Sequence, residues 1–128
     1  MLGNKDATAT IPVRNLEKAK QFYEGTLGLT PIDHEGEEAI VYKGGNTRVL
    51  VYKSEFAGTN KATVATWGVG DDIEQEVKSL HDKGVTFEHY ADMPEVTLKG
   101  DVHVMGDGDM KAAWFKDPDG NIHAMVSR

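Results

Sequence analysis

The five histidines are the side chains best able to hold a metal or move a proton, and their spacing argues against a compact metal centre. They are His34, His81, His89, His103 and His123. None of them pairs with another at the four-residue helical spacing that lets two imidazoles share one ion. The chain has no Cys, which excludes thiolate ligands and disulfides. Asp101 and His103, two residues apart, form the only cluster expected to reach a bound ligand.

The length of the chain limits the number of domains, and its charge excludes some classes of partner. The 128 residues suffice for one domain with a buried core, so we predict a single domain over residues 1–128. A net charge of −7 without a basic stripe argues against nucleic acid and anionic membranes as partners. No apolar run is long enough to span a bilayer, and no secretory signal opens the chain, which favours the cytoplasm.

The first half of the chain is predicted to form a strand, a helix and then three more strands. Residues 7–13 suit a strand, and Asn15 is typical of a helix N-cap. Apolar residues then recur at helical spacing until Gly28, a helix-ending residue. Three more strands are predicted, separated by glycines, at residues 32–35, 39–42 and 48–52.

The second half repeats that order after a connection at residues 54–60. A strand is predicted at residues 62–69, then a helix that starts with a capping box of Asp72 and Gln75 and ends before Gly84. Residues 85–90 suit another strand.

A hairpin closes the chain, with strands expected at residues 111–116 and 121–126. Its turn, Asp117-Pro118-Asp119-Gly120, combines a fixed φ, a backbone-binding carboxylate and a glycine for positive φ. Residues 91–110 are left as a long loop, which in a compact domain suggests a flap or binding loop.

Several motifs in this order resemble the vicinal oxygen chelate superfamily, which contains glyoxalases, extradiol dioxygenases, fosfomycin-modifying enzymes and bleomycin-sequestering proteins. They are Val13-Arg14-Asn15-Leu16, Phe22-Tyr23, Leu27-Gly28-Leu29 and the stretch from Phe115 to Ala124. The resemblance implies an α+β fold of two tandem βαβββ modules, at about residues 5–55 and 60–128. Curved mixed sheets would surround a cup, with helices on the outer face.

The same resemblance implies where metal ligands would stand, and this chain lacks them. Most enzymes of the superfamily hold a divalent metal in the cup, at positions that correspond here to Thr8, Val64, Ala124 and the neighbourhood of Leu50. None of these side chains offers an imidazole, carboxylate or thiolate. We therefore expect neither a metal nor another cofactor.

The cup implied by the resemblance would be apolar and aromatic. Alternation along the strands, with His103 added from the loop, predicts a lining of Thr8, Thr10, Leu50, Tyr52, Val64, Thr66, His103, Ala112, Trp114 and Ala124. Trp114 matches an aromatic position near the active site of fosfomycin-modifying relatives, and small residues beside it leave room for a flat ligand. Trp67 and His123 have the opposite parity and are expected to face the helices.

The function predicted from these residues is metal-independent binding of a hydrophobic or aromatic small molecule. It resembles the role of bleomycin-sequestering members, and the resemblance also implies a homodimer. One alternative is a metal-dependent lyase or dioxygenase with relocated ligands, such as His103 and Tyr52 with Glu37 or Glu38. Two more are a metal-free enzyme using Tyr52 or His103 as acid or base, and an interaction module whose cup is closed by packing.

Overall fold

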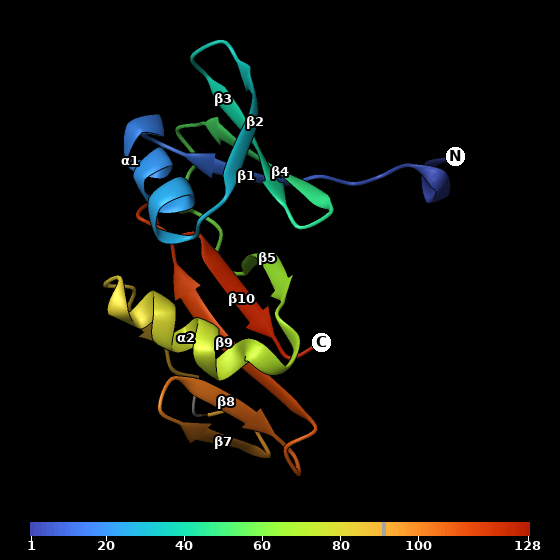
Figure 1. The fold of residues 1–128 in the computed structure, drawn as a ribbon, viewed down its shortest axis with the longest axis vertical. Helices are drawn as coiled ribbons and strands as arrows, with labels where there is room; N and C mark the ends of the chain where they lie inside the picture. Colours follow the sequence, from blue (N-terminus) through green and yellow to red (C-terminus); the bar gives the residue numbers. More distant parts are fainter. Residues whose placement is uncertain (91) are drawn as a thin grey trace. The chain divides into compact units, whose positions relative to one another are not determined.

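A computed structural model describes residues 1–90 and 92–128 (Figure 1). The chain divides into two compact units, Met1–Thr59 and Asn60–Arg128, and each combines helices with a mixed β-sheet. The α+β class and the two-sheet architecture predicted from the sequence are confirmed. Within the described part of the chain, no helix is both long and apolar enough to cross a membrane.

The first unit is a four-stranded sheet with one helical segment. After a short 3₁₀ turn, η1 (Leu2–Asn4), its elements are β1 (Ala9–Val13), α1 (Leu16–Lys20), the π-helical η2 (Gln21–Thr26), β2 (Thr30–Glu35), β3 (Ala39–Gly44) and β4 (Thr47–Lys53). The strand order is β1-β4-β3-β2, and β1 runs parallel to β4 while the other neighbours are antiparallel.

Local chemistry explains where the helical segment of the first unit begins and ends. Asn15 is its N-cap, with the side-chain oxygen accepting a hydrogen bond from the Lys18 amide at 3.1 Å. Gly28 adopts φ +75°, which a residue with a Cβ rarely does. The sequence pattern predicts one continuous helix, but the segment changes from α to π geometry at Gln21.

One face of this sheet is the core of the first unit. Ile11 and Val51 pair with each other in the register and are fully buried. Tyr23 from η2 and Tyr42 from β3 are also fully buried, with their rings stacked 6.2 Å apart. The Tyr42 hydroxyl donates to Glu24 at 2.8 Å, and burial raises the pKa of the phenol.

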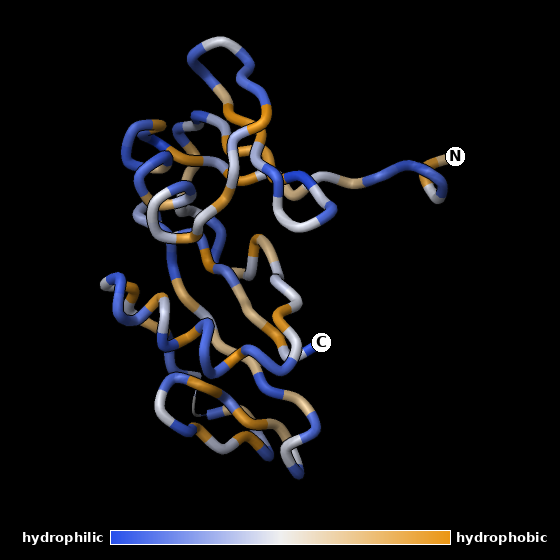
Figure 2. Tube along the Cα trace, viewed as in Figure 1, coloured by the Kyte–Doolittle hydropathy of each residue, from blue (hydrophilic) through white to orange (hydrophobic). Residues whose placement is uncertain are grey.

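The second unit is built on a larger sheet. Its elements are β5 (Thr63–Gly68), the 3₁₀ turn η3 (Gly70–Asp72), α2 (Ile73–Asp82), β6 (Phe87–Glu88), β7 (Val96–Lys99), β8 (Val102–Met105), β9 (Met110–Lys116) and β10 (Ile122–Val126). The order is β5-β10-β9-β8-β7, β6 also pairs with β9, and β5 runs parallel to β10. Apolar and hydrophilic residues alternate along α2, so that Ile73, Val77 and Leu80 are buried on one side (Figure 2).

Two predictions for the second unit are wrong. Asp72 makes no side-chain capping bond, because it lies at the end of η3 with φ −85° and ψ 8° instead of the extended conformation of a true N-cap. The segment 91–110 is not a continuous loop, because it contains the β7–β8 hairpin, which turns at Gly100 with φ +62°. Ala91, which the loop prediction included, lies outside the described residues.

The hairpin of β9 and β10 confirms the turn prediction. Asp117 is buried, and its Oδ1 accepts hydrogen bonds from the amides of Asp119 and Asn121, each at 2.9 Å. The Asn121 side chain donates to the other carboxylate oxygen at 2.8 Å. Gly120 takes φ +91°. The turn thus holds the two strands in the register that determines which residues share a face.

Candidate ligand-binding site

Strand register brings five of the predicted site residues onto one face of the second sheet. His103 lies opposite Ala112, Trp114 lies opposite Ala124, and Ala124 lies beside Thr66. Paired residues on neighbouring strands point to the same side of a sheet. We call this surface the Trp114 face, defined by these five residues. Val64 stands two residues before Thr66 on β5 and is half-buried.

Helix α2 covers the opposite face. Lys111, whose neighbour Ala112 belongs to the Trp114 face, forms an ion pair with Glu74 of α2. Because successive residues of a strand point to opposite sides, α2 lies across the side that carries Lys111 and Phe115. Helix α2 therefore does not cover the Trp114 face, on which His103, Ala112 and Ala124 are buried by other neighbours and Trp114 is half-buried.

Trp114 is held by two aromatic neighbours in edge-to-face contacts. The centre of the His103 ring lies 4.8 Å from the Trp114 ring at an interplanar angle of 90°. The Tyr90 ring lies 5.2 Å away at 77°. Trp114 itself is half-buried, while Ala112 and Ala124 beside it are almost fully buried. The indole is thus fixed in orientation and retains solvent-accessible surface.

Tyr90 is a site residue that the sequence analysis missed. The pairing of Glu88 with Trp114 places Glu88 on the Trp114 face, and Tyr90 stands two residues further along the chain. The same alternation rule that selected the other residues would have found Tyr90, had the strand partner of residues 85–90 been known.

His103 is completely buried in β8, and the expectation that it lies in the loop is wrong. Its Nε2 accepts a hydrogen bond from the Tyr90 amide at 2.8 Å. Among residues 1–90 and 92–128, no acceptor meets the geometry of a hydrogen bond at Nδ1. Burial lowers the pKa of His103; the Ala112 backbone opposes this shift, and His89 adds to it. His103 is therefore a neutral imidazole that links Tyr90 to the sheet.

The predicted cluster of Asp101 and His103 does not form a pair. Asp101 is instead hydrogen-bonded to His89 Nε2 at 2.8 Å. Both partners are partly exposed, and the two histidine rings lie 6.5 Å apart. Only the tertiary structure shows this pairing, because the two residues are separated by twelve positions and by the β7 strand.

The remaining predicted site residues belong to the first unit. Thr10 pairs with Leu50 across β1 and β4, so both lie on the side of the sheet opposite Ile11 and Val51. Tyr52 shares that side by alternation with Leu50. Leu50 and Tyr52 are half-buried, whereas Thr8, which precedes β1, and Thr10 are exposed.

His123 and Trp67 lie on the face covered by α2, as their parity predicts. His123 is fully buried, and its ring stacks on Phe115 with centres 5.1 Å apart and planes 8° apart. Its Nδ1 accepts a hydrogen bond from the Trp67 indole at 3.0 Å. Burial lowers the pKa of His123 to about 4. Both rings serve the core of the second unit.

The chemistry of the residues present does not fit the metal that the superfamily resemblance implies. Ala124 and Val64 are hydrocarbons, and so is Leu50, so they have no lone pair to offer an ion. Thr8 is exposed, and its carbonyl oxygen accepts a hydrogen bond from the Thr10 hydroxyl at 3.1 Å. Within the described ranges, no three His, Asp or Glu side chains lie close enough to share an ion.

Comparison with protein families identifies the superfamily of this chain. Residues 7–124 match the family described as the Glyoxalase/Bleomycin resistance protein/Dioxygenase superfamily. The chain belongs to this superfamily. No curated protein matches its sequence.

Solved structures share the fold at low sequence identity. An integron cassette protein from the mobile metagenome of the Halifax Harbour sewage outfall has 19% identity, with 97% of this chain and 99% of that chain covered and a TM-score of 0.70. Lactoylglutathione lyase from Agrobacterium tumefaciens has 13% identity, coverage of 96% and 92%, and a TM-score of 0.72.

A third similar structure was solved with ligands bound. It is a mutant of the fosfomycin resistance protein FosX from Listeria monocytogenes, in complex with Mn(II) and 1S,2S-dihydroxypropylphosphonic acid. Its identity to this chain is 11%, its TM-score is 0.71, and 97% of this chain and 90% of that chain are covered. At these identities the likeness concerns the fold alone.

Proposed function

We propose that this chain binds a flat, hydrophobic or aromatic small molecule on the Trp114 face, without a metal. The observation that carries the proposal is the half-buried indole of Trp114, oriented by Tyr90 and His103. An aromatic ring fixed at two edges offers its accessible surface for stacking at little further loss of conformational entropy. Ala112 and Ala124 contribute only methyl groups beside it.

Polar groups near this ring are few, which suits a mainly apolar ligand. Thr66 is exposed on the same face, so its hydroxyl can serve as one hydrogen-bond donor or acceptor. His103 has no exposed surface, so its role in the proposed site is to position Tyr90 and Trp114. The first unit contributes further candidate ligand-binding residues, which are Thr8, Thr10, Leu50 and Tyr52.

The decisive variant for this proposal is Trp114→Ala. Its affinity for a planar aromatic probe such as 2-naphthol, measured by isothermal titration calorimetry, should fall about 5- to 150-fold, which corresponds to about 1–3 kcal/mol of lost stacking. Trp67→Phe is the matched control, because Trp67 lies on the face covered by α2 and should leave the affinity unchanged. Equal affinity in the Trp114 variant and the wild type would show that the indole serves the core alone.

The main competing function is an enzyme with relocated metal ligands. Measuring the metal content of the protein distinguishes this enzyme from the proposed metal-free binding protein. Elemental mass spectrometry of untagged protein purified without chelator should find divalent metal well below one ion per chain. This expectation rests on the hydrocarbon side chains of Leu50, Val64 and Ala124, which cannot coordinate an ion. A stoichiometric ion, with glyoxalase or dioxygenase activity lost on chelation and restored by metal, would replace the binding proposal with that enzyme.

Two further alternatives are a metal-free enzyme and an interaction module whose cup is closed by packing. An activity assay with chelator tests the first, and a thermal-shift screen tests the second. Turnover of a bound compound that persists with chelator and falls in Tyr52→Phe would establish the enzyme. An absence of thermal shift with every aromatic compound tested would leave the interaction module. We also infer a cytoplasmic homodimer, supported by the sequence resemblance; sedimentation equilibrium at micromolar concentration tests the oligomeric state.

A further inference from the structure

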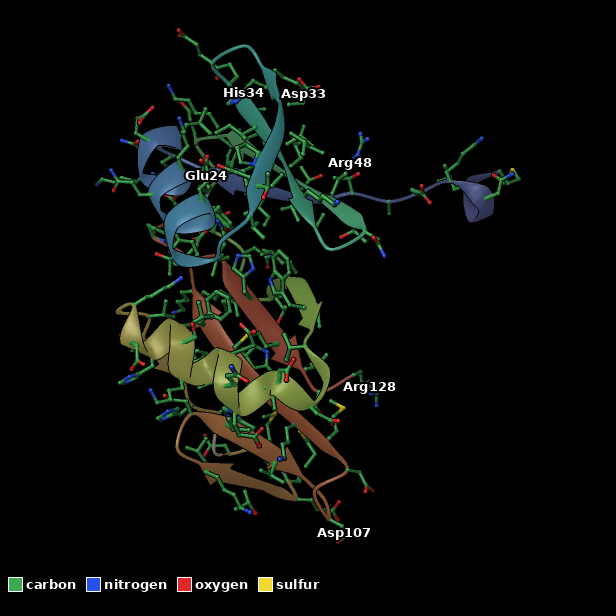
Figure 3. All side chains as sticks on the ribbon, viewed as in Figure 1. Glu24, Asp33, His34, Arg48, Asp107 and Arg128 are labelled. Carbon is green, nitrogen blue, oxygen red and sulfur yellow. The ribbon has the colours of Figure 1, made fainter. Side chains whose placement is uncertain are left out.

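A hollow lies on the first unit, between the first turn of α1 and the turn that joins β2 and β3. It encloses about 480 Å³, and Ile40, which is buried beside the helical segment, forms part of its floor. The register pairs Ile40 with His34 on β2 and with Val51 on β4. The hollow therefore opens on the helix-bearing side of the sheet, opposite the side that carries Leu50. Figure 3 shows His34 on this hairpin.

Three cations converge on this hollow, which we call the Arg14 groove. They are Arg14 before α1, Lys20 at its end and Lys53 at the end of β4. An adjoining hollow of about 580 Å³ is lined again by Arg14 and Lys53, together with Ser54 and the carboxylates of Glu38 and Glu55. Arg14 and Lys53 line both hollows and are therefore available to a ligand in either one.

The three cations have no carboxylate partners in the part of the chain that the structure describes. The ion pairs formed there involve other residues. Arg14 Nη2 donates to the Ala57 carbonyl at 3.2 Å, which anchors the guanidinium and leaves its remaining N–H groups available. Glu17 and Glu37 stand among these three cations, so the charged lining of the groove has a small positive excess in a chain of net charge −7.

The other walls of the groove restrict what it can hold. Ala39 and Ile40 are 5% and 3% exposed and, with Leu16, provide an apolar floor. Glu17 and Glu37 also line the groove and would repel an extended polyanion. These features together suit a compact anionic group attached to a short apolar body.

We propose that the Arg14 groove is a binding site for a small organic anion, with a carboxylate or phosphate held by Arg14 and Lys53. Guanidinium and ammonium groups are the usual partners of both anions. Lys20 adds a third positive charge at the rim, and the apolar body of the ligand rests on Leu16 and Ile40. This site is separate from the Trp114 face and does not depend on the function proposed for that face.

The test is a titration of uniformly ¹⁵N-labelled full-length protein followed by amide chemical shifts at low ionic strength. Butyrate, acetate and inorganic phosphate are the three probes. Shifts should concentrate at residues 14–20, 34–40 and 53, and butyrate should bind more tightly than acetate because of the apolar floor. Phosphate tighter than butyrate would identify the ligand as a phosphate ester, and the reverse order would identify it as a carboxylate.

Charge-neutralising variants make the test specific. Arg14→Gln and Lys53→Gln should each weaken binding about fivefold, whereas Lys43→Gln, an exposed cation on β3 outside the groove, should leave the affinity unchanged. Raising NaCl to about 0.5 M should weaken binding of every probe, since salt screens exposed charges. Saturable shifts at the Trp114 face instead, equal affinity for acetate and butyrate, or an equal loss in Lys43→Gln would overturn the proposal.

Discussion

His123 shows how one ionisable residue can serve as a core aromatic. Its ring lies between Phe115, on which it stacks, and the Trp67 indole, which donates a hydrogen bond to Nδ1. The imidazole is held neutral because a charge at a fully buried position loses its hydration. An imidazole stacked in this way offers a flat aromatic face to Phe115 and also accepts a hydrogen bond from the indole nitrogen of Trp67.

This burial predicts a loss of stability in mild acid. The pKa of His123 falls from 6.5 to about 4 on folding, so the unfolded chain binds more protons between these pH values. The free energy of unfolding should therefore decrease as the pH falls below about 6.5, by about 3 kcal/mol once the pH passes below about 4. Burial of His103, whose pKa is also lowered, acts in the same direction.

Urea unfolding between pH 7.5 and 5.0 measures this effect while most carboxylates stay charged. The variant His123→Phe should keep the stack with Phe115 and reduce the dependence on pH. His81→Gln changes an exposed histidine near the end of α2 and should leave the dependence as in the wild type. Identical slopes for wild type and His123→Phe would contradict a neutral buried His123.

At the scale of elements, the turn between β9 and β10 controls the geometry of the Trp114 face. The buried Asp117 carboxylate accepts three hydrogen bonds from Asp119 and Asn121. These bonds replace those that water would make to the amides of a tight turn. Because the turn sets the register, it determines that Trp114 and Ala124 face the same side.

Asp117→Ala should therefore destabilise the protein strongly. Three donors would lose their acceptor in a partly buried setting, and we expect a loss of about 2–4 kcal/mol in the free energy of unfolding. Asp107→Ala, at an exposed turn between β8 and β9, is the control and should change stability by less than about 0.5 kcal/mol. Chemical denaturation monitored by circular dichroism compares the two, and similar losses would exclude a special role for the Asp117 carboxylate.

At the scale of the whole molecule, excess negative charge acts on stability through self-repulsion. The chain carries 21 acidic and 14 basic residues, and the ion pairs of the described residues have at least one exposed partner. Exposed pairs contribute little to stability, so repulsion among the surplus carboxylates is not offset locally.

Screening this repulsion should raise the thermal stability. The midpoint of thermal unfolding should increase by a few degrees between about 20 mM and about 300 mM NaCl at pH 7.5. Replacing both Glu37 and Glu38, adjacent exposed acids in the β2–β3 turn, with Gln should reduce that increase. A midpoint that falls with salt would mean that attractive ion pairs dominate the electrostatics of the fold.

Some features of the candidate site could be predicted from the sequence, and others could not. The alternation of side chains along β9 and β10 predicted that Ala112, Trp114 and Ala124 share one face. This prediction was possible because a recognisable turn joins the two strands. The β7–β8 hairpin was missed because its strands are short and lie in a segment rich in Gly and Asp. That omission left His103 in a loop and separated Asp101 from its partner His89.

The sequence by itself determined the order of most elements, because that order depends on local periodicity, caps and turns. The resemblance of its motifs to the superfamily implied the α+β class and the strand face that lines the cup. The sequence also determined that hydrocarbons and a threonine occupy the positions where superfamily resemblance places metal ligands. Only the tertiary structure decided that Tyr90 and His103 orient Trp114 and that Arg14, Lys20 and Lys53 converge on one groove. Such contacts join residues far apart in the chain, and their distances follow from packing and strand register, which no local pattern encodes.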